Sequence, residues 1–534
     1  MPETITESVP DERHTGEKWA KRFFVNVLWS WLGVVASFFT GFFLSPYIIR
    51  KLGDQRYGIW ALAFAFIDYY TLFDFGFKSA VVNLISRFQA ERQDLETNEV
   101  INSALFYFIG LGVFIFGLTW FSAPQLHRFF KISPAYQHDF VVLVRIIAVG
   151  WSFAISLNVF QGAIEGFQRF KTANHIWILS LVIRSGGSAI VLLLGHGLIA
   201  MGVVVTIAQF ISFGLTFLTV RRAFPAMRLS PALARIAMWK KIATYGVHSF
   251  VAYLGNTLLI QGPPILVGHY QSEAFVGYYT LPSRLLQYVV ELVTRIGYVT
   301  MPNTAELAAQ GKTKEIVMLG TYLNRYCLAL FLPLSIFLFV YGRELIRVWV
   351  GLSFAEHAAP LLPVFVISTT LAVAGQFNSS QILYGLAKHA DYSKALIVEG
   401  ALGLAAMMVV LPKYGIFGAA CIAAGLAILN RAILTPWFLC RLLDFSLLRY
   451  LRKIYTMPLL TAVPVFAGAV WIKSHWLPGA NWFSLIGSIF LIGAPYYLAC
   501  WFTVVERDHR VLLRGWIAAR LARLPRSTAI GHQQ

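Results

Sequence analysis

The feature that most constrains this chain is a series of apolar segments that follow one another from residue 23 to residue 504. A helix needs roughly 20 mostly apolar residues to cross the hydrocarbon core of a bilayer. Fourteen segments meet or approach that length, and they lie at 23–49, 57–85, 100–122, 139–164, 176–194, 198–220, 242–268, 277–301, 317–341, 359–385, 396–411, 416–440, 457–472 and 481–504. The sequence therefore predicts an all-α polytopic membrane protein with about 14 transmembrane helices.

The composition excludes a water-soluble protein. Hydrophobic residues make up 57% of the 534 residues and charged residues only 13%, whereas a soluble domain is typically about a quarter charged. No loop between the segments is longer than about 21 residues, which leaves little room for a catalytic domain. Nucleotide-binding GxxxxGK[ST] and metal-binding HExxH patterns are absent. We therefore expect no enzymatic activity, no catalytic residue, no metal site and no cofactor.

The basic residues predict the orientation in the membrane. The net charge is +19, and with fourteen spans the loops on one side carry 28 Lys and Arg against 9 on the other. Cytoplasmic loops carry the excess of Lys and Arg, so both termini are expected on the cytoplasmic side of the membrane. We interpret the positive charge as a sign of contact with anionic membrane lipid rather than with nucleic acid.

The chain also repeats itself at an offset of about 219 residues. The pattern Pro-x(11)-Gly-x(3)-Leu-x(6)-Tyr from Pro46 returns from Pro264 with one extra residue, and Asn158, Gln161 and Gly166 are answered by Asn378, Gln381 and Gly385. A parallel duplication of a six-helix unit is typical of transporters. We therefore expect two pseudo-symmetric six-helix bundles plus a C-terminal helix pair. The predicted parts are a tail 1–22, a lobe 23–220, a basic linker 221–241, a lobe 242–440, the helix pair 441–504 and a basic tail 505–534.

Two stretches carry a family resemblance. The run LSPYIIRKLG at 44–53, followed by YGIW at 57–60, DFG at 74–76 and Ala80, resembles Wzx-type polysaccharide flippases of the MOP (MATE-like) exporter superfamily. The run LPKYGIFGAA at 411–420 is similar to the turn between spans 11 and 12 in the same family. The resemblance implies translocation of an undecaprenyl-diphosphate-linked oligosaccharide across a bacterial cytoplasmic (inner) membrane, with a cationic central cavity. It also implies a pathway shared with a polysaccharide polymerase and glycosyltransferases. Alternating access is expected from the two predicted bundles, because one can rock against the other about a central site.

The eighth predicted span, 277–301 (span 8), contains the most informative polar residues. Arg284, Gln287, Tyr288, Glu291 and Arg295 recur at helical spacing, so they share one face. Such a stripe is expected to face protein or a wet cavity rather than lipid. Glu291 and Arg295 are spaced to neutralise each other, whereas Arg284 has no acidic partner on its helix. We expect Arg284 to meet an anionic headgroup, because arginine forks match phosphate oxygens.

The other interior charges allow two readings each. Asp74 and Lys78 are spaced for a local ion pair, and Arg184 adjoins the small residues 185–188. Arg145, Arg325 and Arg431 lie nearer the ends of their segments, where basic side chains often extend to the interface. All of these cations, with Arg284 and Arg295, remain headgroup candidates. Candidates for coupling or ion pairing are Asp68, Asp74, Glu291 and Glu399, and polar candidates for the cavity are Gln287, Tyr288, Asn158, Gln161, Asn378 and Gln381.

Two other interpretations stay open at this point. A MATE-like small-molecule antiporter would have the same span pattern but an acidic or neutral cavity. A membrane polymerase or transferase of envelope polysaccharide assembly would need a place to hold its donor, which the short loops do not offer. The C-terminal residues 507–526 place leucines and an isoleucine at helical spacing among arginines, which predicts an amphipathic helix on the membrane surface or a basic tail.

Overall fold

The computed structural model describes residues 36–74, 76–476, 480–511 and 514–515. Every element within those ranges is helical. The helices of the first half are residues 36–52, α2 (Asp54–Asp68), α3 (Phe77–Ala90), α4 (Asp94–Phe129), α5 (Gln137–Gly166), α6 (Phe170–Leu193) and α7 (Leu198–Ala223). Those that follow are α8 (Ile236–Tyr270), α9 (Glu273–Ala309), α10 (Thr313–Trp349), α11 (Leu352–His357), α12 (Leu361–Gly385), α13 (Ala390–Ala427), α14 (Thr435–Leu442), α15 (Leu447–Trp476) and α16 (Trp482–Thr503).

The prediction of an all-α membrane protein is confirmed. Every apolar segment of the sequence overlaps helix in the described part of the chain. Within that part, nine helical runs are long and apolar enough to cross a membrane, so the exact count of fourteen spans stays a prediction. Long apolar helices are favoured here because a helix satisfies all of its backbone hydrogen bonds internally.

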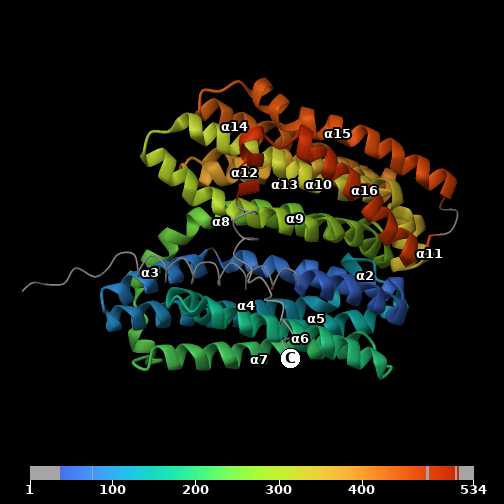
Figure 1. The fold of residues 1–534 in the computed structure, drawn as a ribbon. Coiled ribbons are helices and arrows are strands. Elements are labelled where there is room, and N and C mark those ends of the chain that lie inside the picture. The colour runs from blue at the N-terminus through green and yellow to red at the C-terminus, as the bar shows by residue number, and fades with distance from the viewer. Residues whose placement is uncertain (1–35, 75, 477–479, 512–513, 516–534) are drawn as a thin grey trace, which may run out of the picture. The chain divides into compact units, whose positions relative to one another are not determined.

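The helices form two compact units. The first comprises residues 1–295, 352–361 and 393–426, and the second comprises 296–351, 362–392 and 427–534. In the first unit α4, α5 and α7 run side by side, and α6 lies along α7 (Figure 1). In the second unit α10, α15 and α16 pack on one another. The lobe boundaries at 220 and 242 stay a prediction.

Two spans are less regular than the sequence predicted. The segment 57–85 is not one continuous helix, because a 3-10 turn (Tyr69–Asp74) and Gly76 separate α2 from α3. Gly76 has a φ of 74°, a left-handed conformation that glycine adopts without the steric cost of a Cβ. Near the end of the second half, a π-helix (Ile428–Leu434) joins α13 to α14. Interrupted helices in transporters often line binding sites.

The basic linker 221–241 is held against α4. Asn98 Oδ1 accepts the backbone N–H of Arg228 at 2.7 Å, and its Nδ2 donates to the carbonyl of Ala226 at 3.1 Å. Asn102 repeats the pattern one turn later, with Ser230 N–H at 2.9 Å and the Arg228 carbonyl at 2.7 Å. The two amides thus pair with the linker backbone as a neighbouring β-strand would, which satisfies its polar groups.

Candidate functional site

The polar stripe of span 8 lies on α9 in the first compact unit. Arg284 is exposed, while Gln287, Tyr288 and Glu291 are half-buried. The side chain of Arg295 lies outside the described residues. The helical spacing expected for the first four residues is confirmed, because α9 is continuous from Glu273 to Ala309.

Tyr288 is the residue on which the site converges. Arg284, Glu291 and Arg184 of α6 all act electrostatically on its hydroxyl. Arg284 also acts on Tyr57 of α2, which is itself coupled to Tyr288. Two arginines that are 100 residues apart in the sequence therefore act on one tyrosine hydroxyl. The sequence predicted Tyr288 as a polar residue of the cavity on the same helix face as Arg284, but it did not indicate that Tyr57 lies near Arg284.

The helix of residues 36–52 packs against Tyr288 of this cluster. A Cβ at Gly41 would overlap the hydroxyl of Tyr288, so only glycine lets the tyrosine lie so close to the helix backbone. Phe38, one turn earlier, packs edge-to-face on the Tyr288 ring with centroids 5.8 Å apart. Gly41 was missed by the sequence analysis, because the only signal was one glycine in an apolar run.

The charge of the cluster is net positive. Its charged members are the guanidinium groups of Arg284 and Arg184 and the carboxylate of Glu291. Glu291 and Arg184 have further contacts. Among the described residues, no carboxylate lies within ion-pair distance of Arg284. Two guanidinium groups near tyrosine hydroxyls provide the donors that phosphate oxygens accept.

Lys78 has a different partner from the one expected. Its ammonium group lies 2.8 Å from Oε1 of Glu165 at the end of α5, whereas the local pair with Asp74 does not form. The carboxylate of Asp74 instead accepts the backbone N–H of Lys78 at 3.4 Å, at the start of α3. The helix break before Phe77 explains the difference, because residues 74 and 78 are no longer on one continuous helix. Glu165 was missed because it lies 87 residues away in the sequence.

Arg325 makes a structural contact in the second unit, and its expected extension to the interface stays a prediction. It is only 8% exposed. Its guanidinium donates to the carbonyls of Lys453 and Val504 and forms a 2.8 Å ion pair with Glu506. These contacts join α10 to α15 and to the chain after α16. Its donors are therefore used by the protein rather than offered to a headgroup.

The remaining charged candidates lie in different surroundings. Arg431 lies in the π-helix, acts electrostatically on Tyr392, and has further contacts. Glu399 is buried in α13 and also has contacts. Arg145 of α5 stacks on the ring of Trp120. The side chain of Asp68 lies outside the described residues, and so does most of the tail 507–526.

The amide candidates divide into two groups. Asn378 is fully buried in the second unit, where it accepts from Thr300 and donates to Asn324 and Cys327. It is therefore a core residue, and its expected place in a cavity is wrong. Asn158 and Gln381 are half-buried, and Gln161 is exposed. Asn158 and Asn378 occupy equivalent positions in the repeat, yet they differ in burial, because Asn158 is half-buried and Asn378 is fully buried.

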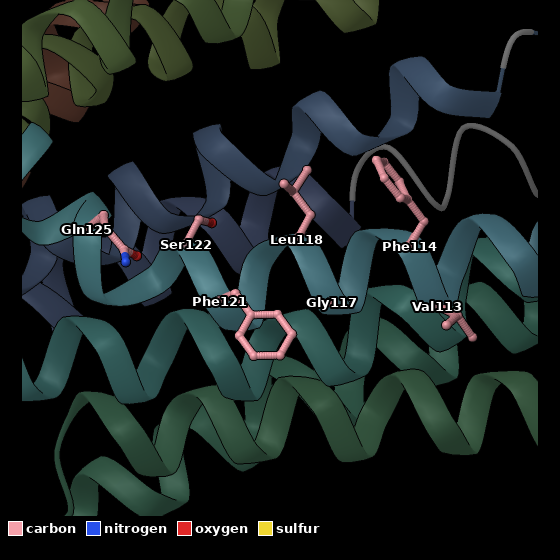
Figure 2. Close-up of a pocket in the computed structure, with 7 residues that line it drawn as sticks. All are labelled: Val113, Phe114, Gly117, Leu118, Phe121, Ser122 and Gln125. Carbon is pink, nitrogen blue, oxygen red and sulfur yellow. The ribbon is translucent and has the colours of Figure 1, made fainter.

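An apolar hollow of about 570 Å³ lies along α4. Figure 2 shows that its lining residues project from one stretch of that helix. They are Val113, Phe114, Gly117, Leu118, Phe121, Ser122 and Gln125. None of them is charged, so this hollow suits hydrocarbon rather than an anionic group.

Comparisons with known proteins show which proteins this chain is similar to over most of its length. The family described as "Polysaccharide biosynthesis protein" matches residues 23–308. A Shigella flexneri protein described as an O-antigen transporter is 20% identical over 399 residues, which cover 74% of this chain and 92% of the relative. The teichuronic acid biosynthesis protein TuaB of Bacillus subtilis strain 168 is 25% identical over 73% of this chain and 76% of its own length.

Solved structures show a similar fold. The lipid II flippase MurJ in an inward closed conformation superposes with a TM-score of 0.65 at 12% identity, covering 92% of this chain and 100% of that one. An inward-facing multidrug resistance transporter of the MATE family and MOP superfamily gives a TM-score of 0.64 at 15% identity, covering 78% and 96%. At these identities the likeness concerns the fold alone.

Proposed function

The chain belongs to the polysaccharide biosynthesis protein family, whose match covers residues 23–308, and from that membership we propose that it moves an undecaprenyl-diphosphate-linked oligosaccharide across the bacterial cytoplasmic membrane. The family resemblance expected from residues 44–76 is thereby confirmed. The chain is a multi-pass membrane protein with a MOP-type helical fold. The named relatives act in O-antigen transport and teichuronic acid biosynthesis.

The observation that carries the proposal is that Arg284 and Arg184 both act electrostatically on the hydroxyl of Tyr288. A diphosphate is present in every such substrate, whatever sugars follow it. Fixed guanidinium groups compensate its charge where water is scarce. The hydroxyl of Tyr288, which is half-buried, supplies a further donor to the same oxygens. A cationic drug would be repelled by this site, which argues against a multidrug exporter.

In this proposal the protein carries out no chemical step. It binds the diphosphate at the arginines, and the lipid tail remains in the bilayer. Rocking of one bundle against the other exposes the site to the two sides in turn. Both termini are on the cytoplasmic side, and the glycosyltransferases and polymerase of the same pathway supply and consume the lipid-linked glycan.

The test is transport by reconstituted protein. Arg284→Ala removes the exposed guanidinium and should slow the movement of a diphosphate-linked oligosaccharide by about tenfold or more, because charge-assisted hydrogen bonds contribute roughly 1.5–3 kcal/mol each. Arg284→Lys keeps the charge without the fork, so an intermediate rate is expected. Arg343→Ala, at an exposed position of α10, is the matched control. Wild-type rates for both Arg284→Ala and Arg184→Ala, in protein that inserts normally, would overturn the proposal.

A further inference from the structure

Arg145 is a cation within a membrane span that lies outside the Tyr288 cluster. Arg145 of α5 places its guanidinium carbon 4.8 Å from the centroid of the Trp120 ring on α4. Its Nε is buried and makes no hydrogen bond with any residue that the structure describes. In the same described part of the chain, no carboxylate lies within ion-pair distance of it. Charged groups in membrane segments are normally paired, so this guanidinium is incompletely satisfied by the protein.

The position of the pair along its helices places it near a membrane surface. α4 has 36 residues and α5 has 30, which corresponds to about 54 Å and 45 Å, against about 30 Å for the hydrocarbon core. Trp120 and Arg145 lie nine and eight residues from the turn that joins these helices. That distance is about 12–14 Å along the axis. With the excess length shared between the two ends of each helix, the hydrocarbon core begins about 12 Å from the end of α4 and about 8 Å from the start of α5. On that placement both residues lie close to the boundary between hydrocarbon and headgroups.

We propose that Arg145 and Trp120 form a binding site for the phosphate group of a lipid in the leaflet at this end of α4 and α5. The indole ring covers one side of the guanidinium, and a guanidinium beside an aromatic ring keeps its N–H donors for other partners. These donors suit two phosphate oxygens. By the expected topology this is the leaflet opposite the cytoplasm.

The surface beside Trp120 suits the hydrocarbon chains of the same lipid. Phe121 follows Trp120 directly and belongs to the apolar hollow along α4 (Figure 2). Val113, Phe114 and Phe121 in that hollow are all exposed. A phosphate lipid has an anionic headgroup and hydrocarbon chains. The headgroup matches the guanidinium at the membrane boundary, and the chains match the apolar hollow beside it. The site is independent of the proposed transport cycle, since it requires only that the helices span a membrane.

The test measures lipid binding by the purified full-length protein with native mass spectrometry. Phosphatidylglycerol is used in one arm and undecaprenyl diphosphate in the other, and diacylglycerol serves as the phosphate-free control. Arg145→Gln should weaken binding of a phosphate lipid about fivefold or more, and Arg145→Lys should weaken it less, because it keeps the charge. Trp120→Leu should weaken it about two- to fivefold. Diacylglycerol binding should not change.

The matched control is Arg128→Gln, which removes an exposed charge in the last turn of α4, the helix that carries Trp120. It should leave binding within about twofold of the wild type. The lipid whose affinity falls further in Arg145→Gln identifies the phosphate source. If Arg145→Gln is not monodisperse, Arg145→Lys and Trp120→Leu decide the test. Unchanged affinity for both phosphate lipids, or an equal loss in Arg128→Gln, would overturn the proposal, and neither result would bear on the Tyr288 cluster.

Discussion

The ammonium group of Lys78 lies 2.8 Å from Oε1 of Glu165 and joins the start of α3 to the end of α5. Both side chains are about 30% exposed, at 31% and 28%, so the pair is partly desolvated. Glu165 precedes Gly166, where a Cβ would crowd Ile85 of α3. The ion pair and the glycine therefore fix the same close approach of two helices.

We expect the Lys78–Glu165 pair to stabilise the packing of α3 on α5. Either Lys78→Met or Glu165→Gln leaves one group unpaired and should lower the free energy of unfolding by about 1–3 kcal/mol. The exchanged double variant, Lys78→Glu with Glu165→Lys, should recover at least half of that loss. Thermal unfolding in detergent measures it, with Asp74→Asn as the comparison, because the Asp74 carboxylate does not pair with the ammonium group. Equal destabilisation by the single and exchanged variants would contradict the pairing.

Gly41 is predicted to be essential for the position of Tyr288. Gly41→Ala forces the tyrosine ring to move, and overpacking of this kind typically costs about 1–3 kcal/mol. Transport should fall with it, because Tyr288 moves relative to Arg284. Gly110→Ala is the matched control, since a Cβ there meets open space, and it should be neutral or slightly stabilising. Comparable transport by Gly41→Ala and Gly110→Ala would show that the close approach is unimportant.

Arg325 is predicted to anchor the chain that follows α16. Arg325→Met leaves the carbonyls of Lys453 and Val504 and the Glu506 carboxylate without their donor. We expect a loss of roughly 2–4 kcal/mol in unfolding free energy, since a buried charge network is broken. Glu506→Gln should cost less, because Glu506 is 43% exposed and solvent screens it. Limited proteolysis after residue 504 provides a second measurement, and wild-type protection in Arg325→Met would argue against the anchor.

The hydrogen bonds of Asn98 and Asn102 to the backbone of the linker 221–241 give a separate test. Asn102→Ala removes partners from the Ser230 N–H and the Arg228 carbonyl. Proteolytic cleavage between residues 224 and 235 should become faster by about fivefold or more, because local opening costs less without these two partly buried hydrogen bonds. Asn158→Ala, on the half-buried surface of α5, serves as the control. An unchanged cleavage rate in Asn102→Ala would contradict the role of the amide.

The topology is tested with reporter fusions. Fusions at Glu91, Lys171, Lys312 and His389 should report the cytoplasm, and those at Pro134 and Ser272 should report the opposite side. The reason is the 28 to 9 distribution of Lys and Arg between the two sets of loops. A reversal at any single loop would contradict the count of fourteen spans and the lobe boundaries derived from it.

The sequence by itself determined the features that depend on local hydropathy and spacing. Apolar runs of sufficient length must become helices in a bilayer, so the all-α membrane fold followed from composition and segment length. The shared face of Arg284, Tyr288 and Glu291 followed from helical periodicity alone. The motif at 44–53 and the residues after it indicated the family.

Only the tertiary structure decided which side chains meet. Asn378 and Arg325 look like cavity or interface residues in the sequence, yet both are buried among partners far away in the chain. Lys78 pairs with Glu165 because a helix break at Gly76 separates it from Asp74. Arg184 of α6 and Arg284 of α9 both act on the hydroxyl of Tyr288, although 100 residues separate them in the sequence. Such contacts depend on how helices pack, and packing between distant segments leaves no periodic signal in a single sequence.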